Sequence, residues 1–145
     1  MTSIRVRVYG LWVNSEKEVL LSDERHGEMN FTKFPGGGLE LGEGVAETLI
    51  REFLEECNIR IDRFELLHVS EQVVFSMFDG SQVIGIYYRV FSDDAFGKAI
   101  KSKVFDFDGN SLQSFRWVPV NELTSDDLTF EMDQVAWENI RERLI

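Results

Sequence analysis

The sequence is poor in residues that mark secreted or membrane-spanning proteins. Of its 145 residues one is cysteine and two are proline, so no intrachain disulfide can form and few prolines interrupt regular structure. It contains no apolar run of about 18 residues, the length that indicates a transmembrane helix. Its N-terminus also lacks the pattern of a signal peptide. We therefore expect a cytoplasmic protein with no membrane partner.

Basic residues are also in deficit. Lysine and arginine number 15 against 26 aspartates and glutamates, which gives a net charge of −11. A surface this acidic disfavours nonspecific binding to nucleic acid, so we expect no nucleic-acid partner. A polyanionic substrate would be repelled as well unless cations intervene. The length predicts a single domain, residues 1–145.

Glycine, by contrast, is concentrated in one segment. Five of the eleven glycines lie between Gly36 and Gly44. Glycine permits positive φ and leaves the backbone uncovered, so a phosphate or a metal ion can approach closely. Pro35 stiffens the entry to this segment and favours extended geometry at Phe34.

A helical pattern follows the glycines. Apolar residues recur at steps of three and four and predict one face against a core; they are Ala46, Leu49, Ile50, Phe53 and Cys57. At about 100° per residue, Glu52, Glu55 and Glu56 fall on one arc beside that face. Such like-charge pairs cost roughly 0.2–0.5 kcal/mol each, and the end of a helix favours cations instead. A bound Mg²⁺ or Mn²⁺ would turn the repulsion into ligation.

Residues 37–59 resemble the Nudix box, G-x5-E-x7-R-E-U-x-E-E-x-G-U, where U is aliphatic or aromatic. The fixed positions that match are Gly37, Glu43, Arg51, Glu52, Glu55 and Glu56, and Ile59 is aliphatic as the last position requires. Asn58 replaces the last glycine, but asparagine enters the left-handed region more readily than other residues with side chains. The resemblance implies a divalent-metal-dependent hydrolase of a small-molecule nucleoside diphosphate linked to another group.

The resemblance also implies roles for individual residues. The implied metal ligands are Glu52, Glu56, Glu55 and the carbonyl of Gly36. The implied catalytic residues are Glu55, Glu52 and Arg51, with Arg51 and Glu43 as an ion pair that ties the loop to the helix. The implied loop around the substrate phosphates contains Gly37, Gly38 and Glu40.

Other side chains leave alternatives open. The general base lies either in the box, as Glu52 or Glu55, or on a later loop, where the candidates are Asp93, Asp94, Asp106, Asp108 and Glu122. A solvated loop acid is the simpler interpretation of each of these five. His26 could contact a substrate phosphate, whereas His68 reads as a packed histidine. Core packing is also the simpler interpretation of four aromatic residues that could stack on a base: Trp12, Trp117, Phe31 and Tyr87.

The rest of the chain alternates strand patterns with turns. Strands are expected at residues 4–13, 18–21, 31–34, 64–69, 72–78, 82–91 and 114–118, with 18–21 returning as the partner of the first. Polar loops are expected at 22–30 and 92–110, and a second helix at about 133–144. This order suits an α/β protein with a mixed sheet packed between helices, which is also the α/β/α sandwich that the Nudix resemblance implies.

The substrate is left open between nucleoside triphosphates and nucleotide sugars such as ADP-ribose. ADP-ribose enzymes of the family often have a proline where this chain has Val74 and Phe75. Diadenosine polyphosphate enzymes often have a tyrosine where it has Ser76 and Met77. Both markers are absent, so a triphosphate is marginally preferred. The alternative function is a noncatalytic nucleotide-sensing module, and a homodimer is an open possibility.

Overall fold

The computed structural model describes residues 3–145. The strands are β1 (Ile4–Trp12), β2 (Glu18–His26), β3 (Met29–Lys33), β4 (Gly36–Gly38), β5 (Arg63–Val69), β6 (Gln82–Phe91) and β7 (Gln113–Pro119). The helices are α1 (Val45–Cys57) and α2 (Glu131–Ile140), with short 3-10 helices at Ser125–Asp127 and Arg141–Leu144. Among these described helices, none has the length and apolarity needed to span a membrane.

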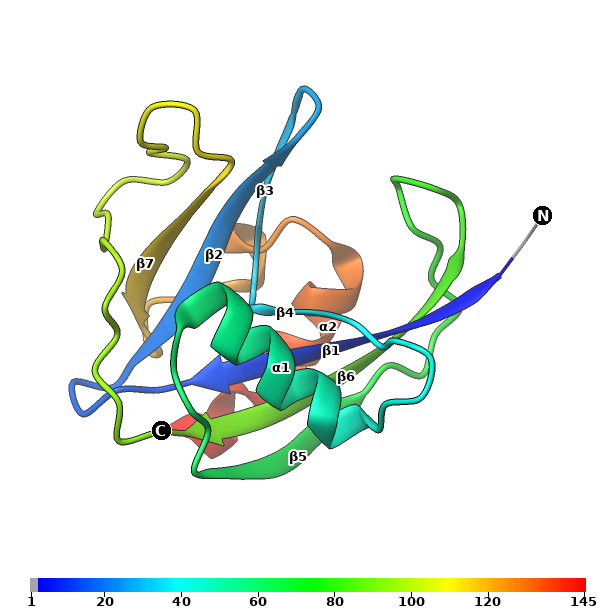
Figure 1. Ribbon diagram of the computed structural model, residues 1–145, viewed down its shortest axis with the longest axis horizontal. Helices are drawn as coiled ribbons and strands as arrows, with labels where there is room; N and C mark the ends of the chain where they lie inside the picture. Colours follow the sequence, from blue (N-terminus) through cyan, green and yellow to red (C-terminus); the bar gives the residue numbers. More distant parts are fainter. Residues whose placement is uncertain (1–2) are drawn as a thin grey trace.

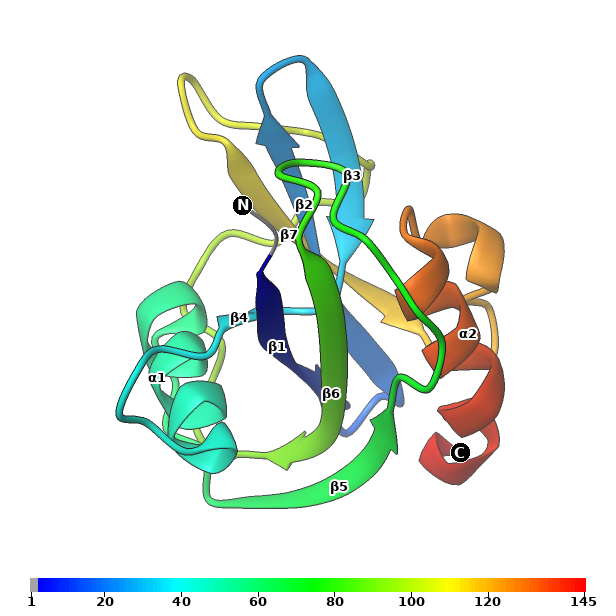
Figure 2. The same cartoon turned by 90° about the vertical axis from the view of Figure 1, so that its right-hand side faces the viewer.

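The strands form two sheets (Figure 1). The first is mixed, in the order β4-β1-β6-β5, with β1 parallel to β6 and the other pairs antiparallel. The second is antiparallel, in the order β3-β2-β7. Figure 2 shows α1 and α2 on opposite sides of the strands. The α/β/α arrangement is therefore confirmed, although its strands belong to two sheets.

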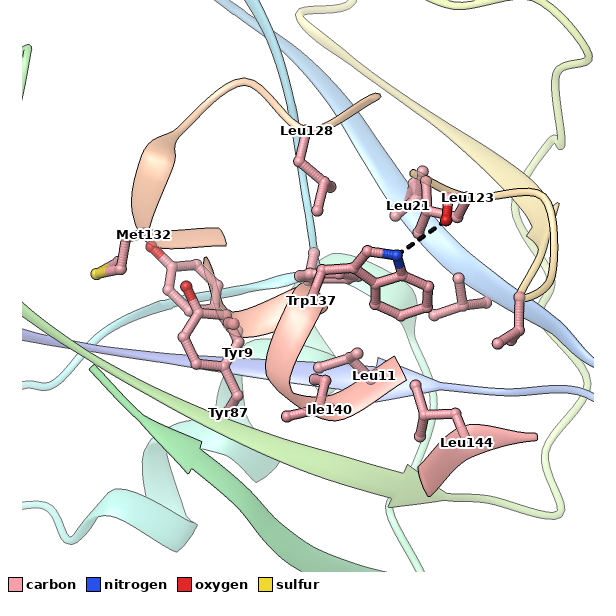
Figure 3. Packing of buried hydrophobic residues seen from close by; sticks show 14 of the residues in the cluster. Tyr9, Leu11, Leu21, Tyr87, Leu123, Leu128, Met132, Trp137, Ile140 and Leu144 are labelled. Atoms are coloured by element: carbon pink, nitrogen blue, oxygen red, sulfur yellow. Dashed lines mark hydrogen bonds between the residues drawn. The ribbon is translucent and has the colours of Figure 1, made fainter. Parts of the chain in front are cut away.

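Alternation along β1 explains the two layers of core. Val8 and Trp12 pack into the cluster that contains Leu49 and Phe53 of α1. Side chains at the intervening positions of β1, such as Tyr9, pack into the cluster that contains α2. Buried Trp137 of α2 anchors this second cluster, and its indole Nε1 donates a hydrogen bond to the Leu123 carbonyl over 2.9 Å (Figure 3).

Helix α1 ends as its sequence predicts. Asn58 adopts φ 54° and ψ 39°, and its backbone N–H donates to the Leu54 carbonyl over 3.1 Å. Buried Cys57 belongs to the core, where burial raises the pKa of its thiol to about 12, so it is no nucleophile at neutral pH. The predicted apolar stripe is wrong at Ile50, which is 41% exposed.

One predicted strand pairing and one predicted strand are wrong. Residues 18–21 do not form a hairpin with β1, since only the bridge between Val13 and Val19 joins those segments and β2 pairs with β3 and β7. Residues 72–78 form no strand but only the isolated bridge between Phe75 and Gln82. The apolar side chains of that segment are largely exposed, so no core holds it in a sheet.

The expected polar loop at 22–30 is instead the end of β2 and the start of β3. Its acid Asp23 is fully buried and receives hydrogen bonds from Arg116 Nε over 2.6 Å and Thr32 Oγ1 over 2.7 Å. These partners satisfy the buried carboxylate, so a polar sequence can form an internal strand.

Candidate functional site

The glycine-rich strand β4 lies between β1 and the acidic face of α1. At Gly37, an added Cβ would lie 2.3 Å from the carboxyl carbon of Glu52. At Gly36, φ is +151° and a Cβ would lie 2.1 Å from the Val8 carbonyl oxygen. Glycine at both positions therefore allows the backbone to touch a carboxylate on one side and a strand on the other.

Arg51 is the centre of the site. Its Nε and Nη2 donate to the two carboxylate oxygens of Glu43 over 2.9 and 2.7 Å, and Nη2 also donates to the Gly38 carbonyl over 3.0 Å. Glu43 accepts further hydrogen bonds from Thr48 Oγ1 and the Glu40 N–H. The hydrogen bonds from Arg51, and then from Thr48, lower the pKa of Glu43 to about 2. The predicted ion pair between loop and helix is present.

The same guanidinium faces three more acids. Its Nη1 lies 2.9 Å from Glu52 Oε1, 3.3 Å from Glu55 Oε2 and 3.7 Å from Glu40 Oε1. One positive charge therefore contacts four carboxylates, and the loop and helix carry a local excess of negative charge. Within residues 3–145, no three acid, histidine or cysteine side chains are already gathered as metal ligands.

Glu56 extends the acidic site towards the core. Its Oε2 accepts a hydrogen bond from the Gly36 N–H over 3.1 Å. Burial raises the pKa of Glu56, while the positive charge of Lys33 acts in the opposite direction. Lys33 Nζ lies 3.5 Å from the Gly36 carbonyl oxygen, so the carbonyl expected to bind metal faces an ammonium group here.

This donor set fits a hard divalent cation. Carboxylate and carbonyl oxygens are the ligands such ions prefer, and the expected donors Glu52, Glu55, Glu56 and Gly36 all lie at the junction of β4 and α1. The Glu55 side chain is 59% exposed, so it can turn towards an ion without disturbing the core. A cation would offset the local excess of negative charge.

A cavity of about 320 Å³ adjoins this site through Lys33 and Arg7, which contact the strand of glycines, although no acid of the box lines it. One part of its wall is aromatic: the Phe31 ring lies 5.4 Å from that of Phe78 and 5.2 Å from that of Phe130. Another part is cationic and is formed by Arg5, Arg7, Arg25 and Lys33. The cavity can therefore hold a flat ring and an anionic group in the same ligand.

Comparison with known proteins identifies the family. The NUDIX domain family matches residues 3–138, which is almost the whole chain. The chain belongs to the NUDIX domain family. By family and by fold it is a NUDIX domain.

Two relatives carry the name nucleoside diphosphate-linked moiety X motif 6. The mouse protein is 38% identical over 58 residues, which are 40% of this chain and 18% of that protein. The Xenopus laevis protein is 38% identical over 55 residues, which are 38% of this chain and 25% of that protein. The Nudix chain thus matches only a minor part of each relative's length.

Solved structures share the fold at low sequence identity. The MutT NUDIX hydrolase from Burkholderia pseudomallei aligns with a TM-score of 0.65 at 23% identity, covering 94% of this chain and 98% of that one. The mutator MutT protein from Bacillus halodurans aligns with a TM-score of 0.67 at 19% identity, covering 92% and 80%. These likenesses support the Nudix fold.

The five acids proposed as bases outside the Nudix box are all exposed. Asp94 accepts a hydrogen bond from the Arg60 N–H over 2.8 Å, and Asp108 pairs with Lys101 over 2.6 Å. The structure brings neither of these two to the box. Asp93, Asp106 and Glu122 are exposed as well.

The aromatic candidates divide between core and cavity. Trp12 packs edge-on against Trp117 at 5.3 Å, and Tyr87 is fully buried, so these three are core residues. Phe31 is buried, with 6% of its surface exposed, and its ring also lines the cavity. His26 lines the cavity as well, and its ring lies 4.8 Å from that of Phe78. His68 packs against Tyr87 with a ring separation of 5.7 Å.

Sequence reasoning missed several cavity residues. Arg5 and Arg7 alternate with apolar residues along β1, and this pattern of charge on one face was a usable signal. Buried Asp133 of α2 also lines the cavity and accepts a hydrogen bond from Tyr87 Oη. Burial raises the pKa of Asp133 to about 6.

Proposed function

We propose that this Nudix domain hydrolyses a nucleoside diphosphate linked to another group, with Mg²⁺ or Mn²⁺ as its cofactor. The observation that carries the proposal is the contact of four carboxylates with Arg51, beside a strand of glycines that leaves the backbone open. Stability alone does not explain why four carboxylates gather around one arginine, because surface ion pairs contribute little to the free energy of unfolding.

The proposed ligands are Glu52, Glu55, Glu56 and the Gly36 carbonyl. A divalent cation bound there would lower the pKa of a water molecule and neutralise charge on the departing phosphate. Arg51 holds Glu52 and Glu55 in position through its Nη1, while Glu43 fixes the other side of the guanidinium. Either Glu52 or Glu55 would accept the proton of the attacking water.

The cavity supports a nucleoside triphosphate as the substrate. Its volume of about 320 Å³ is at the small end of ligand pockets, which span roughly 300–1,000 Å³. The aromatic wall suits a base, since stacking on aromatic rings is available to every base. A nucleotide sugar is the second substrate class.

A hydrolysis panel tests the proposal. The purified domain is incubated with nucleoside triphosphates and ADP-ribose, with Mg²⁺, with Mn²⁺ and with neither, and the phosphate-containing products are separated. We expect metal-dependent release of a nucleoside monophosphate, and isotopically labelled water would show which phosphorus is attacked. Nucleotide binding with no hydrolysis of any substrate would favour the noncatalytic sensing module instead. Analytical ultracentrifugation would decide the open question of a homodimer.

A further inference from the structure

The cationic wall of the cavity contains charges of two kinds. Arg5 Nε lies 3.4 Å from Asp79 Oδ2, and Lys33 Nζ lies 3.1 Å from Glu24 Oε2, so each already has a carboxylate partner. Among the described residues, Arg25 has no such partner but is exposed, and its Nε donates to the Gly27 carbonyl. Arg7 differs from all three, because it is half-buried and has no carboxylate partner in the part of the chain that the structure describes. Within residues 3–145, no carboxylate oxygen lies within 4.0 Å of its guanidinium.

Arg7 is held in a fixed position although it has no carboxylate partner among residues 3–145. Its Nε donates a hydrogen bond to Tyr9 Oη over 2.8 Å, and its guanidinium carbon lies 5.6 Å from the centre of the Tyr9 ring. Buried Tyr9 is in turn stacked on Tyr87 at 5.1 Å. The contact with Tyr9 uses Nε, so the fork of Nη1 and Nη2 is left for another acceptor. A partly buried guanidinium stays charged and is costly to desolvate without an anion.

The position of Arg7 connects the box to the cavity. Arg7 on β1 is opposite Gly38 on β4, and a Cβ at Gly38 would lie 3.9 Å from Arg7 Nη1. The carbonyl of the same glycine accepts the hydrogen bond from Arg51. Gly38 therefore has the arginine of the acidic site on one side and the arginine of the cavity on the other. A phosphate chain that ran from the acids into the cavity would pass this point.

We propose that Arg7 binds a phosphate group of the substrate where the substrate leaves the acidic site and enters the cavity. The planar guanidinium fork matches two phosphate oxygens, and such charge-assisted pairs are among the strongest hydrogen bonds in proteins. The ligand is a mononucleotide, with its phosphate at Arg7 and its base against Phe31, Phe78 and Phe130. This inference rests on the proposed function for the identity of the substrate.

Metal-free binding tests the role of Arg7 separately from catalysis. Calorimetry in EDTA compares the monophosphates of adenosine, guanosine, cytidine and uridine with the corresponding nucleosides. We expect at least one monophosphate to bind about ten- to a hundredfold more tightly than its nucleoside, the range for a charge-assisted hydrogen bond. Arg7→Gln should remove most of this preference, and Arg7→Lys should keep part of it.

Arg63→Gln is the matched control, since Arg63 also lies on a strand but is exposed and pairs with Glu65. It should keep the wild-type preference, and thermal unfolding should show that each variant is folded. A full preference for monophosphate in Arg7→Gln, or no preference in the wild-type protein, would overturn the inference. If Arg7→Gln does not fold, an undiminished preference in Arg7→Lys would overturn it.

The two proposals fail separately. Arg7-dependent phosphate binding in a protein that hydrolyses nothing would refute the proposed function and leave this inference standing. Hydrolysis of the panel by a protein with no Arg7-dependent preference would refute this inference alone.

Discussion

The buried carboxylate of Asp133 makes the stability of this domain depend on pH in an unusual direction. Burial raises its pKa from 3.8 to about 6, although the hydrogen bond from Tyr87 and the charges of Lys33 and Arg7 act to lower it. The folded state therefore holds this proton more tightly than the unfolded state does. The contribution of the protonated Asp133 to the free energy of unfolding is fully present below pH 3.8 and is lost as the pH rises through about 6.

Replacing Asp133 by asparagine should remove this dependence. A shift of about two pKa units corresponds to about 3 kcal/mol, since one unit is about 1.4 kcal/mol. The side chain is 1% exposed, so little solvent screening reduces this figure. Asparagine keeps an acceptor for Tyr87 Oη without a charge. At neutral pH we therefore expect Asp133→Asn to raise the free energy of unfolding by up to about 3 kcal/mol.

Urea unfolding of wild type and variant across the acidic range provides the assay. The difference between their free energies of unfolding should be small near pH 3.8 and should grow until about pH 6. Taking the difference cancels the titration of the other acids. Asp126→Asn, on an exposed 3-10 helix, is the control and should give a small, constant difference. A difference for Asp133→Asn that does not change with pH would show that the folded state does not raise the pKa of Asp133.

Three further substitutions test other parts of the structure. Gly37→Ala places a Cβ 2.3 Å from the Glu52 carboxyl carbon, so it should displace Glu52 and lower turnover at least about tenfold. Gly38→Ala is the control, because its Cβ meets nothing nearer than 3.9 Å and the acidic site should stay intact. Equal Mn²⁺ affinity in both variants would contradict the expected displacement of Glu52. Asn58→Ala should lower the free energy of unfolding by about 1 kcal/mol and Asn58→Gly should not, because Asn58 caps α1 with a φ of 54°. Equal thermal stability of the two variants would show that the left-handed cap does not contribute. Glu56→Gln should lower turnover by orders of magnitude and leave the fold intact, and wild-type turnover would show that Glu56 binds no metal.

Local sequence patterns predicted the elements whose partners are close in the chain. The glycine segment, the helix with its three acids and the left-handed cap at Asn58 depend on spacing over a few residues. The pair of Arg51 and Glu43 is likewise only eight residues apart. These features carry the Nudix box, so the family could be inferred before the structure.

Features set by distant partners could not be predicted. The end of β2 looks like a polar loop because Arg116, which satisfies Asp23, lies 93 residues away. The cavity joins Arg7 of β1 to Phe78 and to Phe130, and no local pattern relates these positions. Residues 72–78 are rich in apolar side chains, as a strand is, but the segment pairs with the sheet only through the isolated bridge between Phe75 and Gln82.

Titration of Mn²⁺ and Mg²⁺ into the purified domain, with and without a nucleoside triphosphate, shows whether the acids of the box bind a metal ion. We expect saturable binding by the wild-type protein that is weakened at least about tenfold in Glu52→Gln and Glu56→Gln, because each variant loses a carboxylate ligand. Absence of binding under every condition, or equal affinity in the wild type and both variants, would contradict the assignment of these acids to a metal site.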